Sequence, residues 1–182
     1  MKRVEKNDPV AIFRLASSCQ HEKDYDGALK HLSDAAAMGN IDAHYFLGDL
    51  YLHGRPGDIE KDVDKAAHHW GEAAIGGHPE ARYDLGCLEW NVRNNRERAV
   101  QHLIIASKQG HDEAIKQLKN IYKEFSSVEG LIKKEDFASA LRGHQAAVSA
   151  TKSTQRDMAS KLLKTCLHHS KKVVTSSNCH SL

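Results

Sequence analysis

The stretch "DAHYFLGDLY", residues 42–51, decides the fold because a glycine stands inside an otherwise regular helical pattern. Ala43, Leu47 and Leu50 recur at i, i+4 and i+7, which is the spacing of one apolar helix face. Gly48 lies in that face, where glycine costs about 1 kcal/mol relative to alanine. The same cost recurs at Gly86 in "EARYDLGCLE". A glycine that appears twice in the same pattern indicates a role in packing.

The pattern around Gly48 belongs to an internal repeat. One helix recurs 38 residues later, with Ala43, Tyr45, Leu47, Gly48 and Leu50 matched by Ala81, Tyr83, Leu85, Gly86 and Leu88. A second helix recurs three times, as Ala28, Leu32, Ala35 and Gly39, then Ala66, Trp70, Ala73 and Gly77, then Ala99, Leu103, Ala106 and Gly110. A period of 30 to 40 residues is typical of a solenoid of helical hairpins. The sequence therefore predicts an all-α fold of stacked hairpins, each with a helix A followed by a helix B.

Two sets of residues punctuate the hairpins. A glycine follows each helix B, at Gly39, Gly77 and Gly110, where a residue with positive φ ends a helix well. Start signals for the next helix A follow, at Asp42, Pro79–Glu80 and Asp112. Gly48 and Gly86 lie inside helix A instead. Because glycine has no Cβ, we expect them to let helix B of the same hairpin approach closely.

These residues resemble the Sel-one-like repeat family, relatives of the tetratricopeptide repeat. The family pattern joins A-x-A-x-Y-x-L-G-x-L-Y, a loop with glycines, and K-A-x2-W-x2-K-A-A-x2-G. Residues 41–78 match it closely, residues 79–111 match it with a shortened loop, and residues 8–40 match at the hairpin core. The resemblance implies a right-handed α-α solenoid of such hairpins with a C-terminal capping helix.

The predicted domain organisation follows from this pattern. Repeats occupy 8–40, 41–78 and 79–111, and a half repeat at 112–125 completes a solenoid over 8–125. A turn at 126–132 leads to a helical extension at 133–169 and a flexible basic tail at 170–182. Apolar residues of the extension form one stripe, with Phe137, Leu141, Val148, Met158, Leu162, Leu163 and Leu167. The stripe either covers the open end of the solenoid or binds a partner helix.

Composition limits the classes of function. The chain is 40% hydrophobic and 27% charged, which is ordinary for a globular protein. It shows no apolar run long enough for a membrane span and no secretory signal at residues 1–10, so we expect a cytoplasmic location, with the nucleus also open. Residues 151–182 carry six Lys or Arg and one Asp, but no aromatic residues lie between them. We therefore expect neither nucleic acid nor membrane as a partner.

Several groups of residues imitate metal sites. "EGLIKKEDF" resembles half of an EF-hand loop, but Phe125 would occupy the first ligand position and cannot bind calcium. The adjacent pairs His68–His69 and His168–His169 would point about 100° apart on a helix, which makes a poor chelate. The spacing of Cys166, His168, Cys179 and His180 matches no structural zinc pattern. The sequence predicts no metal and no cofactor.

Catalytic patterns are equally weak. The chain contains no phosphate-binding glycine loop, no H-E-x-x-H and no G-x-S-x-G. Cys87 could pair with a nearby histidine as a nucleophile, but no third group is present to orient the pair. The chain is therefore predicted not to be an enzyme.

Tetratricopeptide repeats suggest where a partner would bind. There, helix A lines the concave side of the solenoid, and extended peptides bind in that groove. By this analogy the predicted partner-binding residues are Asp42, Tyr45, Asp49, His53, Glu80, Tyr83, Cys87, Trp90 and Asn91. Two roles fit Trp90, since tryptophan is favoured at binding hot spots but could also pack under the C-terminal helix.

The predicted function is that of a non-catalytic adaptor or scaffold that binds a protein or peptide in the groove. Two alternatives follow from resemblance. The chain is similar to algal and diatom proteins in which a RING-type zinc finger sometimes precedes such repeats, but it shows no such finger, so nothing ligase-like carries over to its residues. The resemblance to the repeat family itself suggests a component of a ubiquitin-linked quality-control complex. Some cysteine-rich relatives were proposed to hydrolyse β-lactams, but they carry a cysteine pair in each repeat and this chain does not.

Overall fold

The computed structural model describes residues 8–54, 59–125 and 130–177, and for residues 156 and 159–177 it describes the backbone alone. These residues form eight helices in chain order, α1 (Pro9–His21), α2 (Tyr25–Ala37), α3 (Ile41–His53), α4 (Val63–Ile75), α5 (Pro79–Asn91), α6 (Arg96–Lys108), α7 (Asp112–Phe125) and α8 (Lys134–Ser177). The described part of the chain contains no β-strand, which confirms the predicted all-α class. None of the described helices is both apolar enough and long enough to cross a membrane.

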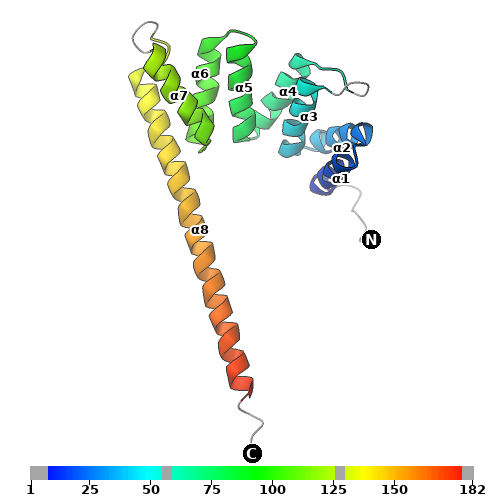
Figure 1. The fold of residues 1–182 in the computed structure, drawn as a ribbon, viewed down its shortest axis with the longest axis vertical. Coiled ribbons are helices and arrows are strands. Elements are labelled where there is room, and N and C mark those ends of the chain that lie inside the picture. Colours follow the sequence, from blue (N-terminus) through cyan, green and yellow to red (C-terminus); the bar gives the residue numbers. More distant parts are fainter. Residues whose placement is uncertain (1–7, 55–58, 126–129, 178–182) are drawn as a thin grey trace, which may run out of the picture.

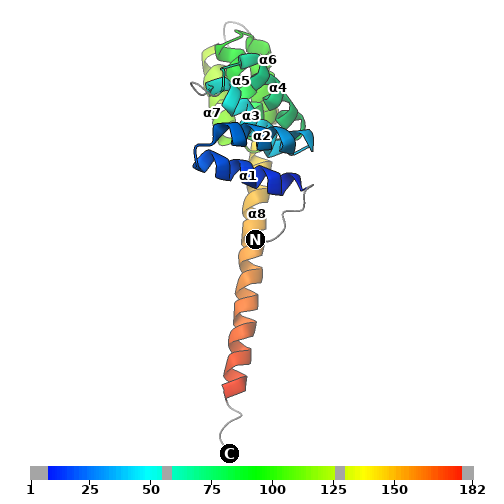
Figure 2. The ribbon, with the colours of Figure 1, turned by 90° about the vertical axis from the view of Figure 1, so that its right-hand side faces the viewer.

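The helices pack in the order in which they follow one another. The strongest contacts join α1 to α2, α3 to α4 and α5 to α6, and each helix B then packs on the next helix A. Figure 1 shows α1 to α7 side by side in an arch, with α8 leaving one end. Figure 2 shows α1 and α2 lying across the long axis of the molecule, along which α8 runs. This sequential stacking is the predicted solenoid.

Three clusters of buried apolar side chains hold the stack together. The first joins Leu32 of α2 to Leu47 of α3, and the second joins Trp70 of α4 to Leu85 of α5. The third joins Leu103 of α6 to α7 and to the start of α8. Each cluster therefore spans the boundary between two hairpins.

Each turn between hairpins uses its glycine as predicted. Gly39, Gly77 and Gly110 have φ of 83°, 95° and 96°, a left-handed conformation that side chains with a Cβ disfavour. At the first turn the amide of Gly39 donates to Ala36 O at 2.8 Å and the amide of Asn40 donates to Ala35 O at 3.0 Å. This pair of bonds is the Schellman motif, which satisfies the last carbonyls of helix B.

The residue after each glycine also starts the next helix. Asn40 accepts from the amide of Ala43 at 2.8 Å, and His78 and His111 accept through Nδ1 from the equivalent amides at 3.2 Å. The predicted start signals lie one to two residues later, with Pro79 in the first helical position and the carboxylates of Asp42, Glu80 and Asp112 in the first turns. Carboxylates in the first turn stabilise a helix because they interact with the positive end of its dipole. Two imidazoles thus act as N-caps, a role for which histidine gives little sequence signal.

Gly48 and Gly86 lie against helix B, as predicted. A Cβ on Gly48 would overlap the indole ring of Trp70, which is 2% exposed. A Cβ on Gly86 would lie 3.2 Å from the side chain of Leu103 and 3.3 Å from the carbonyl oxygen of Ala99, a milder crowding than at Gly48. Lys119 takes the equivalent place in α7 and is exposed. The glycine is therefore needed only where a large helix-B side chain faces it.

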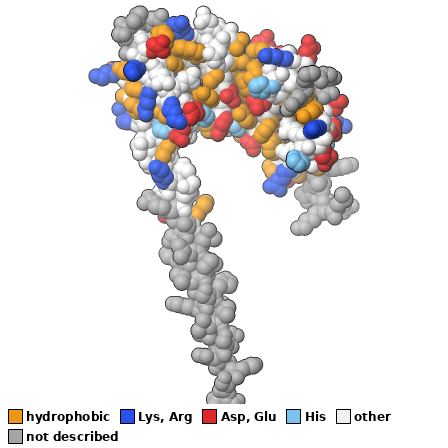
Figure 3. All heavy atoms as spheres, in the orientation of Figure 1, with side chains coloured by type: hydrophobic (Ala, Val, Ile, Leu, Met, Phe, Trp, Pro, Cys, Tyr) orange, Lys and Arg blue, Asp and Glu red, His pale blue; other side chains and the backbone are white. Residues whose placement is uncertain are grey.

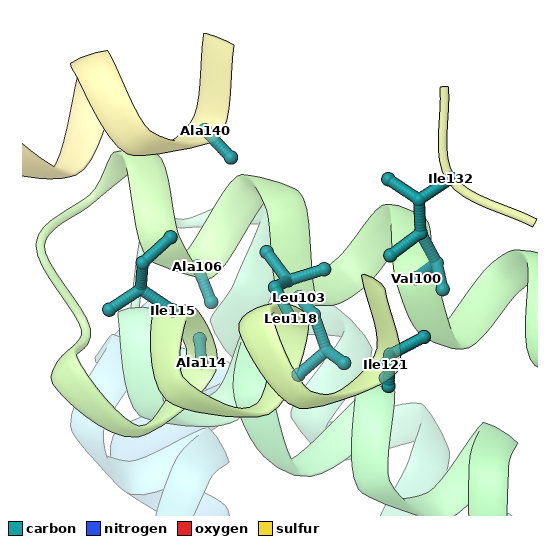
Figure 4. Close-up of a cluster of buried hydrophobic side chains, with 9 residues drawn as sticks. All are labelled: Val100, Leu103, Ala106, Ala114, Ile115, Leu118, Ile121, Ile132 and Ala140. Atoms are coloured by element: carbon teal, nitrogen blue, oxygen red, sulfur yellow. The ribbon is translucent and has the colours of Figure 1, made fainter. Parts of the chain in front are cut away.

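The start of α8 covers the open end of the solenoid. Figure 4 shows Ala140 of α8 and Ile132 beside the buried side chains of α6 and α7. Phe137 stacks on Tyr122 of α7 with ring centroids 4.2 Å apart. Gly143 packs closely on Lys108 at the end of α6. These contacts give α8 the place of a final helix B.

The rest of α8 extends away from the solenoid (Figure 1). Described side chains from Ser149 to Met158 are exposed, and Met158 is 60% exposed. The predicted stripe therefore covers the solenoid at Phe137, Leu141 and Val148 but not at Met158. Helix α8 ends at Ser177, eight residues beyond the predicted boundary at 169. The side chains of Leu162, Leu163 and Leu167 lie outside the described side chains.

Substitution of Gly48 tests the close approach of the helices. We expect Gly48→Ala to lower the free energy of unfolding by about 1–3 kcal/mol, because the new methyl group overpacks the Trp70 contact. Gly86→Ala is the matched control, since its helix-propensity gain of about 1 kcal/mol offsets a milder contact. Chemical denaturation of both variants measures the difference. Equal effects at the two sites would contradict a special contact at Gly48.

Candidate functional site

Helices α3, α5 and α7 form one continuous surface, which we call the helix-A face. Its side chains from α3 and α5 are Asp42, Tyr45, Asp49, His53, Glu80, Tyr83, Asp84, Cys87 and Asn91. The Tyr45 hydroxyl donates a hydrogen bond to Asp84 across α3 and α5. The Cys87 thiol lies 3.8 Å from Gln117 Oε1 across α5 and α7. Polar contacts between repeats therefore run along this face.

Asp84 is the most perturbed carboxyl group of the face. Burial and, to a lesser degree, the negative charge of Asp49 raise its pKa to about 6, while the hydrogen bond from Tyr45 opposes the shift. Glu80 adds a third negative charge nearby. Among the described residues neither Asp49 nor Asp84 pairs with a lysine or arginine. The negative charge of the two carboxylates therefore has no lysine or arginine partner in the described part of the chain, and His53 is the nearby group whose positive charge would favour the ionised form of Asp84.

Acidic side chains are also numerous at the starts of the A helices. The first turns of α3, α5 and α7 carry Asp42, Glu80, Asp112 and Glu113. Figure 3 shows acidic side chains gathered along the lower edge of the arch, the side toward which α8 descends. The charge of this edge extends the acidic character of the helix-A face.

Two tyrosine–histidine pairs link the face to the helix caps. Tyr45 stacks on His78 with ring centroids 4.4 Å apart, and Tyr83 stacks on His111 at 4.6 Å. Because each imidazole caps the next helix A, the stack fixes each tyrosine relative to the following repeat. Burial lowers the pKa of His111, which keeps this imidazole neutral as its capping role requires. His78 and His111 are thus half-buried N-caps.

Cys87 lacks the properties of a reactive thiol. Its side chain is half-buried, and burial raises the pKa of the thiol, with the nearby carboxylate of Asp84 raising it too. A hydrogen bond with Tyr83 opposes the shift without reversing it. Reactive cysteines have lowered pKa values because the thiolate is the nucleophile. The surroundings of Cys87 favour the protonated thiol.

Trp90 lies at the edge of the helix-A face. Its indole packs edge-on against Phe125 of α7, with centroids 5.9 Å apart, and the guanidinium of Arg96 lies over both rings. The residue is half-buried beside the last apolar cluster. The eight other predicted residues lie together on the face, with Asp49, His53, Cys87 and Asn91 lining hollows between neighbouring repeats.

Asp84 was not predicted as a site residue, although the sequence contains a signal for it. It stands in register with Phe46, 38 residues earlier, so a carboxyl group replaces an aromatic ring at the same place in the repeat. Comparison of the two repeats position by position would have identified it. Gln117 gave no such signal, because its role depends on the contact with Cys87.

The histidines form one close pair in the described chain. His44 and His69 approach with their Nδ1 atoms 3.2 Å apart, and burial followed by the charge of His44 lowers the pKa of His69 to about 4. Within the described residues no group of three His, Cys, Asp or Glu side chains could hold a metal ion. The side chains of Cys166, His168, Cys179 and His180 lie outside the described side chains.

A larger cavity of about 860 Å³ lies away from the helix-A face, at the start of α6. Arg93, Arg96 and Lys133 line it together with Glu97 and Asp136, so its charges are mixed. Gly130 at its edge directly follows residues 126–129, which are not described. Because positive and negative side chains are mixed in this cavity, its charge favours neither an anionic nor a cationic ligand.

The repeats match a known family model. The Sel1 repeat model matches residues 9–40, 41–78 and 79–111, which together make up more than half of the chain. The chain belongs to the Sel1 repeat family. Proteins of this family are generally helical-repeat scaffolds for protein interactions. A comparison with curated protein sequences finds no significant match.

Two solved structures are similar to the chain. A Sel1 repeat protein from Oxalobacter formigenes is 27% identical with a TM-score of 0.63, and the match covers 80% of this chain and 60% of that protein. A protective antigen of uropathogenic Escherichia coli strains with the same repeat fold is 24% identical with a TM-score of 0.63, over 77% of this chain and 31% of the antigen. The chain thus spans about a third to three fifths of these proteins, and the similarity supports the fold.

The pKa of Asp84 predicts a pH-dependent effect of its substitution. Its folded pKa lies above the unfolded value, so ionisation of Asp84 lowers stability as the pH rises through about 6. We expect Asp84→Asn to melt a few degrees above the wild type at about pH 7.5 and by a clearly smaller margin at about pH 4.5, between the unfolded and folded pKa values. Thermal denaturation followed by circular dichroism measures both. A constant difference at the two pH values would show that Asp84 is not perturbed.

Proposed function

We propose that this Sel1 repeat protein is a non-catalytic scaffold that binds a protein or peptide partner on the helix-A face. The proposed contact residues are Asp42, Tyr45, Asp49, His53, Glu80, Tyr83, Asp84, Cys87 and Asn91, with Trp90 at the edge. Family membership supports the general role, and the surface chemistry of the chain supports the choice of face.

The observation that carries this proposal is the unneutralised charge at Asp84. A half-buried carboxyl group with a pKa near 6 lowers stability at neutral pH, and the equivalent position one repeat earlier is occupied by the uncharged Phe46. Destabilising charges of this kind cluster at functional sites. A partner that neutralises Asp84, Asp49 and Glu80 would recover the lost stability.

The surroundings of Cys87 argue against hydrolysis through that residue. Its raised thiol pKa is the reverse of what a nucleophile needs. The ubiquitin-linked alternative rests on the resemblance to the repeat family, and recovery of a ubiquitin ligase by the chain would support it. In the ubiquitin-linked alternative, the partner that binds the helix-A face is a ubiquitin ligase.

Affinity capture tests the choice of face. We expect the tagged full chain to recover a partner from a lysate of its source organism, and the double variant Asp49→Asn with Asp84→Asn to lose it, because the variant removes the charges that attract the partner. Asp34→Asn on the exposed side of α2 is the matched control. Quantitative mass spectrometry compares the three samples.

All three proteins should show the same helical circular dichroism before capture. If the double variant recovers the same proteins at the same level as the control, then the helix-A face is not the binding surface.

A further inference from the structure

The helix-A face is hollowed at the same place in two successive repeats. The first pocket, of about 260 Å³, lies between α1 and α3, and the second, of about 180 Å³, lies between α3 and α5. Five wall positions are related by the repeat shift of 38, with Phe46, Asp49, Leu50, His53 and Gly54 matched by Asp84, Cys87, Leu88, Asn91 and Val92. The two pockets are therefore copies of one feature of the repeat.

The walls of the two pockets differ in chemistry. In the first pocket the carboxylate of Asp49 and the side chains of Gln20 and His53 supply hydrogen-bond acceptors. Asp49 has no lysine or arginine partner among the described residues. A lysine or arginine side chain complements this pocket, because its head group donates hydrogen bonds and carries the opposite charge.

The second pocket is mostly apolar. Leu52 of α3, Leu88 of α5 and the exposed Val92 contribute its walls, and the indole of Trp70 lies at its base. Its volume suits one aliphatic side chain, whose burial stabilises a complex by about 1.5–3 kcal/mol. Asp84 at its edge adds negative charge between the two pockets.

The distance between the pockets sets the spacing of their ligands. Tyr45 of α3 stacks on His78, the N-cap of α5, so α3 and α5 lie side by side and their pockets are separated by about 10 Å, the upper end of the range for packed helices. An extended chain of the polyproline II type rises about 3.1 Å per residue with three residues per turn. Side chains three residues apart therefore lie on the same side at about 9 Å.

We infer that the partner binds as an extended segment with an aliphatic side chain in the second pocket and a lysine or arginine, three residues away, in the first pocket. This inference rests on the proposed function and names the chemistry of its partner. The charge of Asp49 and Asp84 selects the basic residue, and the apolar walls select the aliphatic one. The distance between the two pockets sets the spacing of the two side chains along the segment.

Synthetic peptides test the inference with the full chain. Each peptide carries one leucine and one lysine in a Gly/Ser host, separated by one to five positions in either order. Titration into ¹⁵N-labelled protein, followed by amide chemical shifts, measures the affinity and locates the contacts. We expect the tightest binding at a spacing of three, with shifts at the amides around Asp49 and Leu88.

Substitutions in each pocket assign the two side chains. Asp49→Asn should weaken binding by about threefold, the effect of a partly exposed ion pair, and only for peptides that contain lysine. Asn91→Trp, which covers the second pocket from an exposed position, should weaken binding by about tenfold, and only for peptides that contain leucine. Asp34→Asn and Ser33→Trp on the exposed side of α2 are the matched controls and should leave the affinity unchanged.

Three outcomes would overturn the inference: equal affinity at all spacings, shifts outside the two pockets, or no binding to any peptide. If affinity capture still depends on Asp49 and Asp84, these outcomes remove only the inferred segment and leave the proposed function in place. If capture is also unchanged in that double variant, the proposed function fails as well.

Discussion

No hairpin of this chain can bury its apolar face within itself, and the rest of the structure depends on that constraint. Every buried cluster joins a helix B to the following helix A, as Leu32 meets Leu47 and Trp70 meets Leu85. Hydrophobic burial drives folding, so each hairpin is stable only beside a neighbour. In place of a further repeat after α7, Ile132 just before α8 and Ala140 within α8 supply the missing surface.

The same constraint positions the candidate site. The turn that ends helix B at Gly77 leads directly into His78, which caps α5 and stacks on Tyr45 of the previous repeat. Neighbouring A helices are thereby held side by side, and their outward side chains form one face. Because the buried positions are filled by alanine and leucine, the exposed positions of α3 and α5 are free to carry charge. Asp84 uses that freedom at the expense of stability.

Most of the fold could be predicted from the sequence because the buried apolar residues recur with the period of the repeat. The recurrence of Gly48 at Gly86 identified the helix pairs, and the positive φ of Gly39 agrees with the expected turn. The caps at His78 and His111 could not be predicted. The Nδ1 atom of a histidine accepts a hydrogen bond only in one tautomer of the neutral imidazole, and tertiary packing selects that tautomer. The pockets depend on contacts between repeats, so their residues carry no local pattern. The last turns of α8, residues 170–177, were not predicted as helix because their sequence is mostly polar and continues no apolar stripe.

The central claim, that each unit depends on its neighbour for burial, is tested most directly by comparing two truncated chains. Residues 1–150 keep the turns of α8 that cover α6 and α7, whereas residues 1–125 lose them. Thermal denaturation of both, beside the full chain, measures the contribution of that cover. The account predicts that 1–150 melts at the temperature of the full chain and that 1–125 melts well below it and binds a hydrophobic dye. A chain of 1–125 that melts like the full protein would contradict the account.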